Sequence, residues 1–155
     1  MKWKLPPKIK IYEALGSLGD GRIEISGNTG KVYSSSGQKF YAVVFDPEQK
    51  SIMANDNGSY WQGYLGYPSI AFLMKTGIIK FNSVYSEALK GIAWKDINTE
   101  FENDFGKTAD YVHEMLKERG IASSDFLEEV DSIYGQIEKL DLALLGSKTK
   151  PPQGY

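Results

Sequence analysis

Apolar side chains near the start of the chain recur with a helical period. They follow one another every three residues from Ile9 to Leu18, as on one stripe of a helix. Pro7 precedes this stripe and Gly19 follows it, which matches the preference for proline at a helix start and glycine past its end. The alternation over residues 8–12 also suits a strand, but it stops there. We therefore predict a helix over residues 7–18.

From residue 21 to residue 56 the pattern changes to short β-favouring runs separated by glycine, asparagine and serine. Strands joined by connections this short pair as an antiparallel meander. Residues 40–45 are apolar throughout, so both faces of that strand carry hydrophobic side chains. The predicted strands are 22–26, 31–35, 39–46 and 51–54.

Helical spacing returns after residue 67, in segments that each end at a glycine. Asp125 and Glu128 resemble a capping box at the start of the last segment, whose apolar face continues to Gly146. The predicted helices are 68–76, 83–90, 96–105, 108–119 and 125–146. The side chains that we expect in the core are Phe40, Val43, Phe45, Ile70, Leu73, Phe101, Val130, Ile133 and Ile137.

These elements predict an α+β fold with an N-terminal helix, a three- to four-stranded antiparallel meander and then a C-terminal helical layer. The charge varies smoothly and the chain has 155 residues, so one domain is expected over residues 1–146. Residues 147–155 are polar and contain proline, which predicts a flexible tail.

Composition removes several classes of function. A net charge of −2 excludes the broad basic surface of a general nucleic-acid coat protein. Cysteine is absent, which excludes a disulfide scaffold and a thiol nucleophile. The single histidine, His113, is too few for a typical zinc site, and we expect it on a solvated helix face. No metal and no cofactor are predicted.

The first residues have the positive start of a signal peptide but lack its apolar stretch, because Pro6 and Pro7 interrupt it. No apolar run approaches the ~20 residues that span a bilayer. A cytoplasmic location without membrane contact is therefore expected.

Charge is divided unevenly along the chain. Residues 1–50 hold 8 basic and 5 acidic side chains, whereas residues 51–155 hold 10 basic and 15 acidic ones. The two halves are either two layers of one fold or complementary faces of a dimer, and we expect a homo-oligomer. The lysine-rich N-terminus also suggests a weaker hypothesis of nucleic-acid binding, which the net charge disfavours.

The densest unusual segment joins the predicted sheet to the helix that begins at Pro68. It combines four aromatic residues with three glycines between residues 58 and 67. Aromatic rings offer stacking faces, and glycines let a ligand approach the backbone. The alternative is that these rings simply seal one end of the sheet. The candidate binding residues are Asp56, Tyr60, Trp61, Tyr64, Tyr67 and Arg22.

We predict a binding or interaction module that uses residues 59–68 as its contact surface, rather than an enzyme. The first alternative is a small enzyme that acts on a phosphorylated or sugar-like compound in a pocket beside Pro68. The sequence leaves open the identity of the small-molecule ligand, the oligomeric state, and whether the aromatic residues form a site or a packed core.

Overall fold

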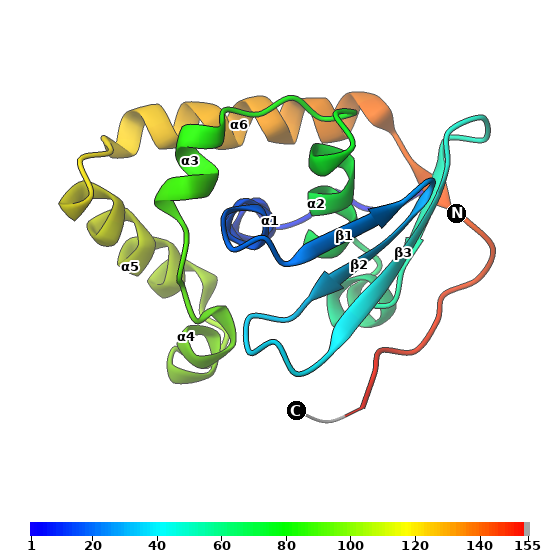
Figure 1. Cartoon of the computed structure of the whole chain (residues 1–155), viewed down its shortest axis with the longest axis horizontal. Coiled ribbons are helices and arrows are strands. Elements are labelled where there is room, and N and C mark those ends of the chain that lie inside the picture. The colour runs from blue at the N-terminus through cyan, green and yellow to red at the C-terminus, as the bar shows by residue number, and fades with distance from the viewer. Residues whose placement is uncertain (154–155) are drawn as a thin grey trace.

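The structure, a computed structural model, describes residues 1–153. It confirms the α+β fold, with a helix first, a sheet next and a helical layer last (Figure 1). Helix α1 (Ile9–Gly19) is followed by strands β1 (Ile23–Ser26), β2 (Thr29–Tyr33), β3 (Phe40–Asp46) and β4 (Ser51–Ala54). After a π-helical turn, η1 (Gly58–Gln62), come helices α2 (Tyr67–Lys75), α3 (Ser83–Ala88), α4 (Trp94–Glu100), α5 (Phe105–Glu118) and α6 (Ser123–Leu140). The last element is strand β5 (Ala143–Leu144).

Strands β1 to β4 form the predicted antiparallel meander, in sequence order. Gly27 adopts a positive φ of 58° in the turn between β1 and β2, where a side chain would be strained. The register sets Val32 opposite Tyr41 and Val43 opposite Ala54, on the face that packs against the helices. This face is buried because α2 covers it, and α1 packs in turn against α2.

All α-helices lie on one face of the sheet (Figure 1). Helix α2 contacts all four strands of the meander, and the ring of Phe72 packs edge-on against Phe45 with 6.0 Å between centroids. The opposite face is more open, and Phe40 on it is 41% exposed. The prediction that Phe40 lies in the core is wrong, because it pairs with Tyr33 on this outer face. Phe101 is only half-buried, whereas the other predicted core residues are buried.

The last helix ends six residues earlier than the glycine at which we expected it to stop, at Leu140 rather than Gly146. Asp141 takes a left-handed conformation with a φ of 47°, which turns the chain out of the helix. The following backbone then pairs with distant segments: β5 runs parallel to β4, and Leu144 N donates to Met1 O at 2.8 Å. These long-range hydrogen bonds replace those of the predicted helix.

The predicted tail begins after β5. Lys148 Nζ donates to Tyr60 O at 3.5 Å, and Lys39 Nζ donates to Pro152 O at the same distance. The last two residues of the tail, 154–155, lie outside the described part of the chain. Across residues 1–153, none of the helices has the length and apolar character needed to cross a membrane.

Candidate functional site

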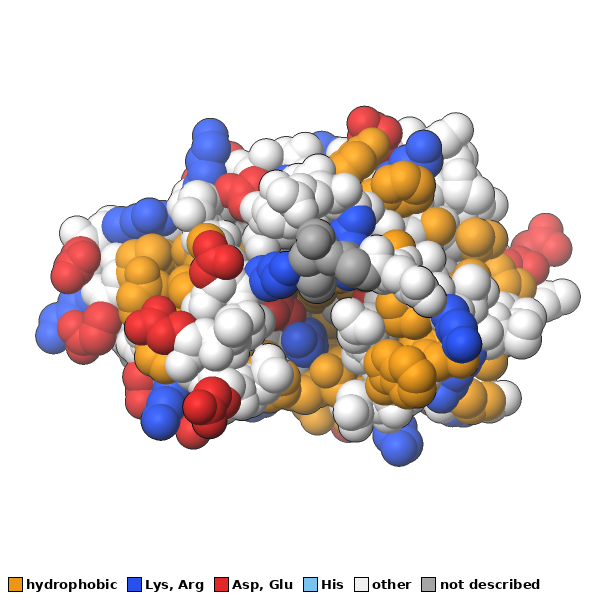
Figure 2. Space-filling view, turned by 90° about the horizontal axis from the view of Figure 1, so that it is seen from below, with side chains coloured by type: hydrophobic (Ala, Val, Ile, Leu, Met, Phe, Trp, Pro, Cys, Tyr) orange, Lys and Arg blue, Asp and Glu red, His pale blue; other side chains and the backbone are white. Residues whose placement is uncertain are grey.

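A cavity of about 440 Å³ lies between α1, the sheet, the loop that follows β4, and α4. Figure 2 shows a hollow near the middle of this side of the molecule, with basic side chains beside it. The lining of the cavity combines charged side chains, aromatic rings and uncharged hydrogen-bonding groups. The charged residues are Lys10, Glu13, Arg22, Asp56 and Lys95, the aromatic ones are Tyr41, Tyr67 and Trp94, and the uncharged polar ones are Ser34, Ser35, Asn57, Asn98, Thr99 and Asn103.

Three of the six predicted site residues, Arg22, Asp56 and Tyr67, line this cavity. The other three do not belong to its lining. Trp61 is 66% exposed and packs edge-on against Tyr60, with 4.7 Å between ring centroids. Tyr64 lies over Gly58, where an added Cβ would come within 2.4 Å of the tyrosine ring. Within the aromatic segment, Tyr67 therefore forms part of the cavity wall and Tyr64 packs inward. Trp61, packed against Tyr60, forms an exposed tip.

Helix α1 contributes an ion pair to the cavity wall. Lys10 and Glu13 are three residues apart on the helix, so their side chains meet, and Lys10 Nζ lies 3.0 Å from Glu13 Oε2. Asn98 Nδ2 donates to the other carboxylate oxygen, Oε1, at 2.9 Å. Burial acts to lower the pKa of Lys10, but Glu13, Tyr64 and Asp56 together outweigh it and hold that pKa above its usual value. Lys10 is therefore a fixed cation at neutral pH.

Arg22 enters from the start of β1 and is held on two sides. Its Nε donates to Asp20 Oδ2 at 3.0 Å, and its Nη1 donates to the carbonyl oxygen of Tyr33. The guanidinium also lies beside the hydroxyl of Tyr67. Burial raises the pKa of Tyr67 above its usual value, and the positive charge of Arg22 offsets only part of this effect. Tyr67 thus keeps its proton and can donate it.

Asp56 is buried in the loop that leads to η1. Its Oδ1 accepts from Ser59 Oγ at 2.6 Å and its Oδ2 accepts from Ser59 N at 3.2 Å, which anchors the first turn of η1. The carboxyl lies so close to Gly66 that a Cβ there would be 1.9 Å from Oδ2. Burial raises the pKa of Asp56, although the hydrogen bonds from Ser59 act to lower it. Asp56 therefore holds the loop that forms one wall of the cavity.

Helix α4 supplies a wall that the sequence did not indicate. Trp94 is 4% exposed, and its indole lies against Gly16 of α1. Its Nε1 has no hydrogen-bond acceptor among residues 1–153. This nitrogen lies against the backbone of α1, where a Cβ at Gly16 would be 2.6 Å from it. Lys10, Glu13, Trp94 and Lys95 were all missed; the one available signal was a charged residue, Glu13, within the apolar part of the first helix.

His113 lies away from the cavity. It is half-buried rather than solvated as expected, because its Nε2 is 2.7 Å from the Tyr12 hydroxyl and its ring packs near Phe126. Within the described residues, no group of three or more histidine, cysteine, aspartate or glutamate side chains is placed to hold a metal ion.

Residues 3–143 match the family described as Uncharacterised conserved protein UCP014422. The chain belongs to this family. No curated protein and no solved structure matches the chain. The family covers every element that borders the cavity, from α1 to α4.

Proposed function

We propose that this protein binds a small polar molecule in the cavity between α1, the sheet and α4. The observation that carries the proposal is the lining: a volume of about 440 Å³ bordered by largely buried charged side chains and by aromatic rings. Small-molecule sites have volumes of roughly 300–1,000 Å³ and combine aromatic walls with a few placed polar groups. Tyr41, Tyr67 and Trp94 are such walls.

Binding is favoured over catalysis because the carboxyl groups of the site are already hydrogen-bonded or ion-paired within the protein. Glu13 accepts from Asn98 and faces Lys10, and Asp56 accepts twice from Ser59. One observation supports the enzyme alternative, which would act on a phosphorylated or sugar-like compound. Asp56 is a carboxyl of raised pKa beside a cavity, a combination that is enriched at catalytic sites.

The test compares two tryptophan substitutions on α4. Thr99 lines the cavity, so Thr99→Trp should fill part of it, whereas Glu100→Trp places the same bulk on an exposed neighbour outside the lining. Thermal unfolding of each protein is followed with a panel of sugars, nucleosides and their charged derivatives. We expect at least one compound to raise the unfolding midpoint of the wild type and of Glu100→Trp but not of Thr99→Trp.

Equal shifts in both variants would contradict the proposal, as would the absence of any shift across the panel. Each stabilising compound is then incubated with the wild type and analysed for a product. Turnover would establish the enzyme alternative.

A partner surface at the tip of the aromatic segment is a second candidate function, because Trp61 is 66% exposed and exposed tryptophan is uncommon outside contact sites. We expect Trp61→Ser to weaken any self-association seen by sedimentation equilibrium, with the fold unchanged. A monomer at high concentration in both proteins would contradict self-association there.

A further inference from the structure

We propose that the ligand of this cavity carries a phosphate or carboxylate group and that Arg22 binds it. This inference rests on the proposed function and names the chemical class of its ligand. It comes from the excess of basic over acidic side chains around the cavity and from the way in which Arg22 is held.

Arg22 is oriented before any ligand arrives. Its side chain is 12% exposed, and two of its N–H groups already donate, one to Asp20 and one to the carbonyl of Tyr33. A guanidinium has five N–H donors in a planar fork, and a third one bonds the Tyr67 hydroxyl, so two N–H groups remain for a ligand. A fork of this geometry matches the paired oxygens of a carboxylate or a phosphate.

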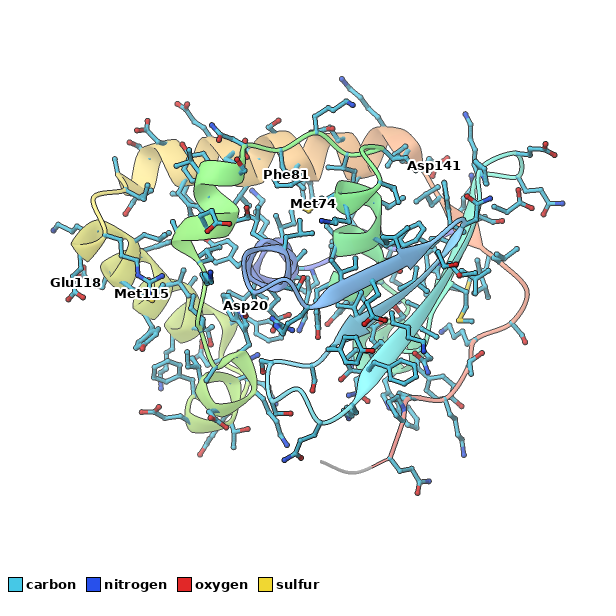
Figure 3. The ribbon with its side chains drawn as sticks, viewed as in Figure 1. Asp20, Met74, Phe81, Met115, Glu118 and Asp141 are labelled. Atoms are coloured by element: carbon cyan, nitrogen blue, oxygen red, sulfur yellow. The ribbon has the colours of Figure 1, made fainter. Side chains whose placement is uncertain are left out.

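Asp20 acts as a positioning residue for Arg22. While its Oδ2 accepts from Arg22, its Oδ1 accepts from the backbone N–H of Gly91 at 2.7 Å. Figure 3 labels Asp20 where α1 ends, near the sheet and the segment between α3 and α4. The carboxylate therefore ties the guanidinium both to its own turn and to the segment that leads into α4.

Basic side chains outnumber acidic ones around the cavity: Lys10, Arg22 and Lys95 line it with Glu13 and Asp56. Asp56 accepts twice from Ser59, and Glu13 accepts from Asn98 and pairs with Lys10, so both acidic groups have protein partners. The guanidinium of Arg22 keeps N–H groups beyond its bonds to Asp20, Tyr33 and Tyr67. Lys10 adds a fixed positive charge. A ligand that supplies acceptor oxygens and negative charge complements this set.

Matched compounds test the inference by calorimetric titration. Glucose, glucose 6-phosphate and glucuronate share one ring and differ in charge, and adenosine with AMP forms a second neutral and charged pair. We expect a charged member to bind at least about tenfold more tightly than its neutral parent, since hydrogen bonds between charged groups are the stronger ones. Tighter binding of glucose 6-phosphate or AMP identifies a phosphate as the ligand's charged group, and tighter binding of glucuronate identifies a carboxylate.

The variant Arg22→Gln removes the guanidinium, and Lys31→Gln makes the same change of charge on the outer face of the sheet, opposite Ala42. We expect Arg22→Gln to weaken binding of the charged compound about tenfold or more and Lys31→Gln to leave it unchanged. If Arg22→Gln does not fold, Arg22→Lys keeps the charge, loses the fork and should still bind at least about threefold more weakly.

If the neutral parents bind as tightly as their charged derivatives and Thr99→Trp still blocks them, the anion assignment is wrong. The proposed function then stands. Unchanged affinity in Arg22→Gln and in Arg22→Lys would also overturn the anion assignment. Failure of every compound, neutral or charged, would instead contradict the proposed function.

Discussion

Replacing Gly16 by alanine tests how α4 is held against α1. An added Cβ at this position would lie 2.6 Å from Trp94 Nε1 and 3.1 and 3.2 Å from two carbons of the same ring. The indole forms part of the cavity wall and must move to admit the methyl group. The matched control is Gly135→Ala, a second helical glycine, whose Cβ would meet nothing within 4 Å.

The expected magnitudes follow from two opposing effects. Alanine favours a helix over glycine by about 0.5–1 kcal/mol at either position. At Gly16 this gain is opposed by overpacking against a buried ring, which costs about 1–3 kcal/mol. We therefore expect Gly135→Ala to raise the free energy of unfolding by about 0.5–1 kcal/mol and Gly16→Ala to lower it by about 1–2 kcal/mol.

Urea unfolding followed by circular dichroism measures both changes. A double-mutant cycle then isolates the contact: in a Trp94→Phe background the smaller ring leaves room, so Gly16→Ala should become much less destabilising. If Gly16→Ala is as stable as Gly135→Ala, or if its cost persists in the Trp94→Phe background, the packing argument is wrong.

Two further predictions concern titrating groups. Burial raises the folded-state pKa of Asp56 above its unfolded value, so the stability that it contributes is fully present below about pH 4 and is lost as the pH rises through the folded pKa. Asp56→Asn can accept from Ser59 N through its one amide oxygen and donate its amide N–H to Ser59 Oγ, and it carries no charge. Its stability relative to the wild type should therefore improve between pH 4 and pH 7 in urea titrations; a constant difference would contradict this. Burial raises the pKa of Tyr12 to about 12, with smaller contributions from nearby carboxylates, so its contribution to stability is lost as the pH rises from about 10 to 12. Tyr12→Phe should flatten the alkaline part of the stability curve and, by removing the 2.7 Å hydrogen bond to His113, cost about 1 kcal/mol at neutral pH; an unchanged alkaline curve would refute the assignment.

Local patterns were enough to predict the sheet and most helices. The meander followed from turn residues and short β-favouring runs, and β4 has the predicted bounds, 51–54. The error at the C-terminus has a different origin. An apolar stripe continues past Leu140, but backbone pairing with β4 and Met1 decides the conformation there. Such pairing joins segments far apart in the sequence, so no local period reveals it.

The candidate site was predictable only in part, because some of its contacts also join segments far apart in the sequence. Arg22, Asp56 and Tyr67 lie in or beside turns whose composition was unusual, and the sequence pointed to them. Glu13 and Asn98 are 85 positions apart and meet only after α4 has folded against α1. Asn98 is an ordinary polar residue on its own helix, and Glu13 stands out only as a charged residue within the apolar part of α1.

Two largely buried ion pairs are the strongest argument for the proposed binding site. The side chains of Lys10 and Glu13 are 16% and 6% exposed, and those of Arg22 and Asp20 are 12% and 18% exposed. Two other ion pairs of the chain, by contrast, keep more than half of each side chain exposed. A buried pair must overcome the loss of hydration of both ions, and apolar side chains of similar volume often stabilise a protein as well or better. Stability alone therefore does not account for two such pairs beside one cavity. The proposed binding site would account for them, because its ligand would meet groups whose hydration and side-chain entropy are already lost before binding.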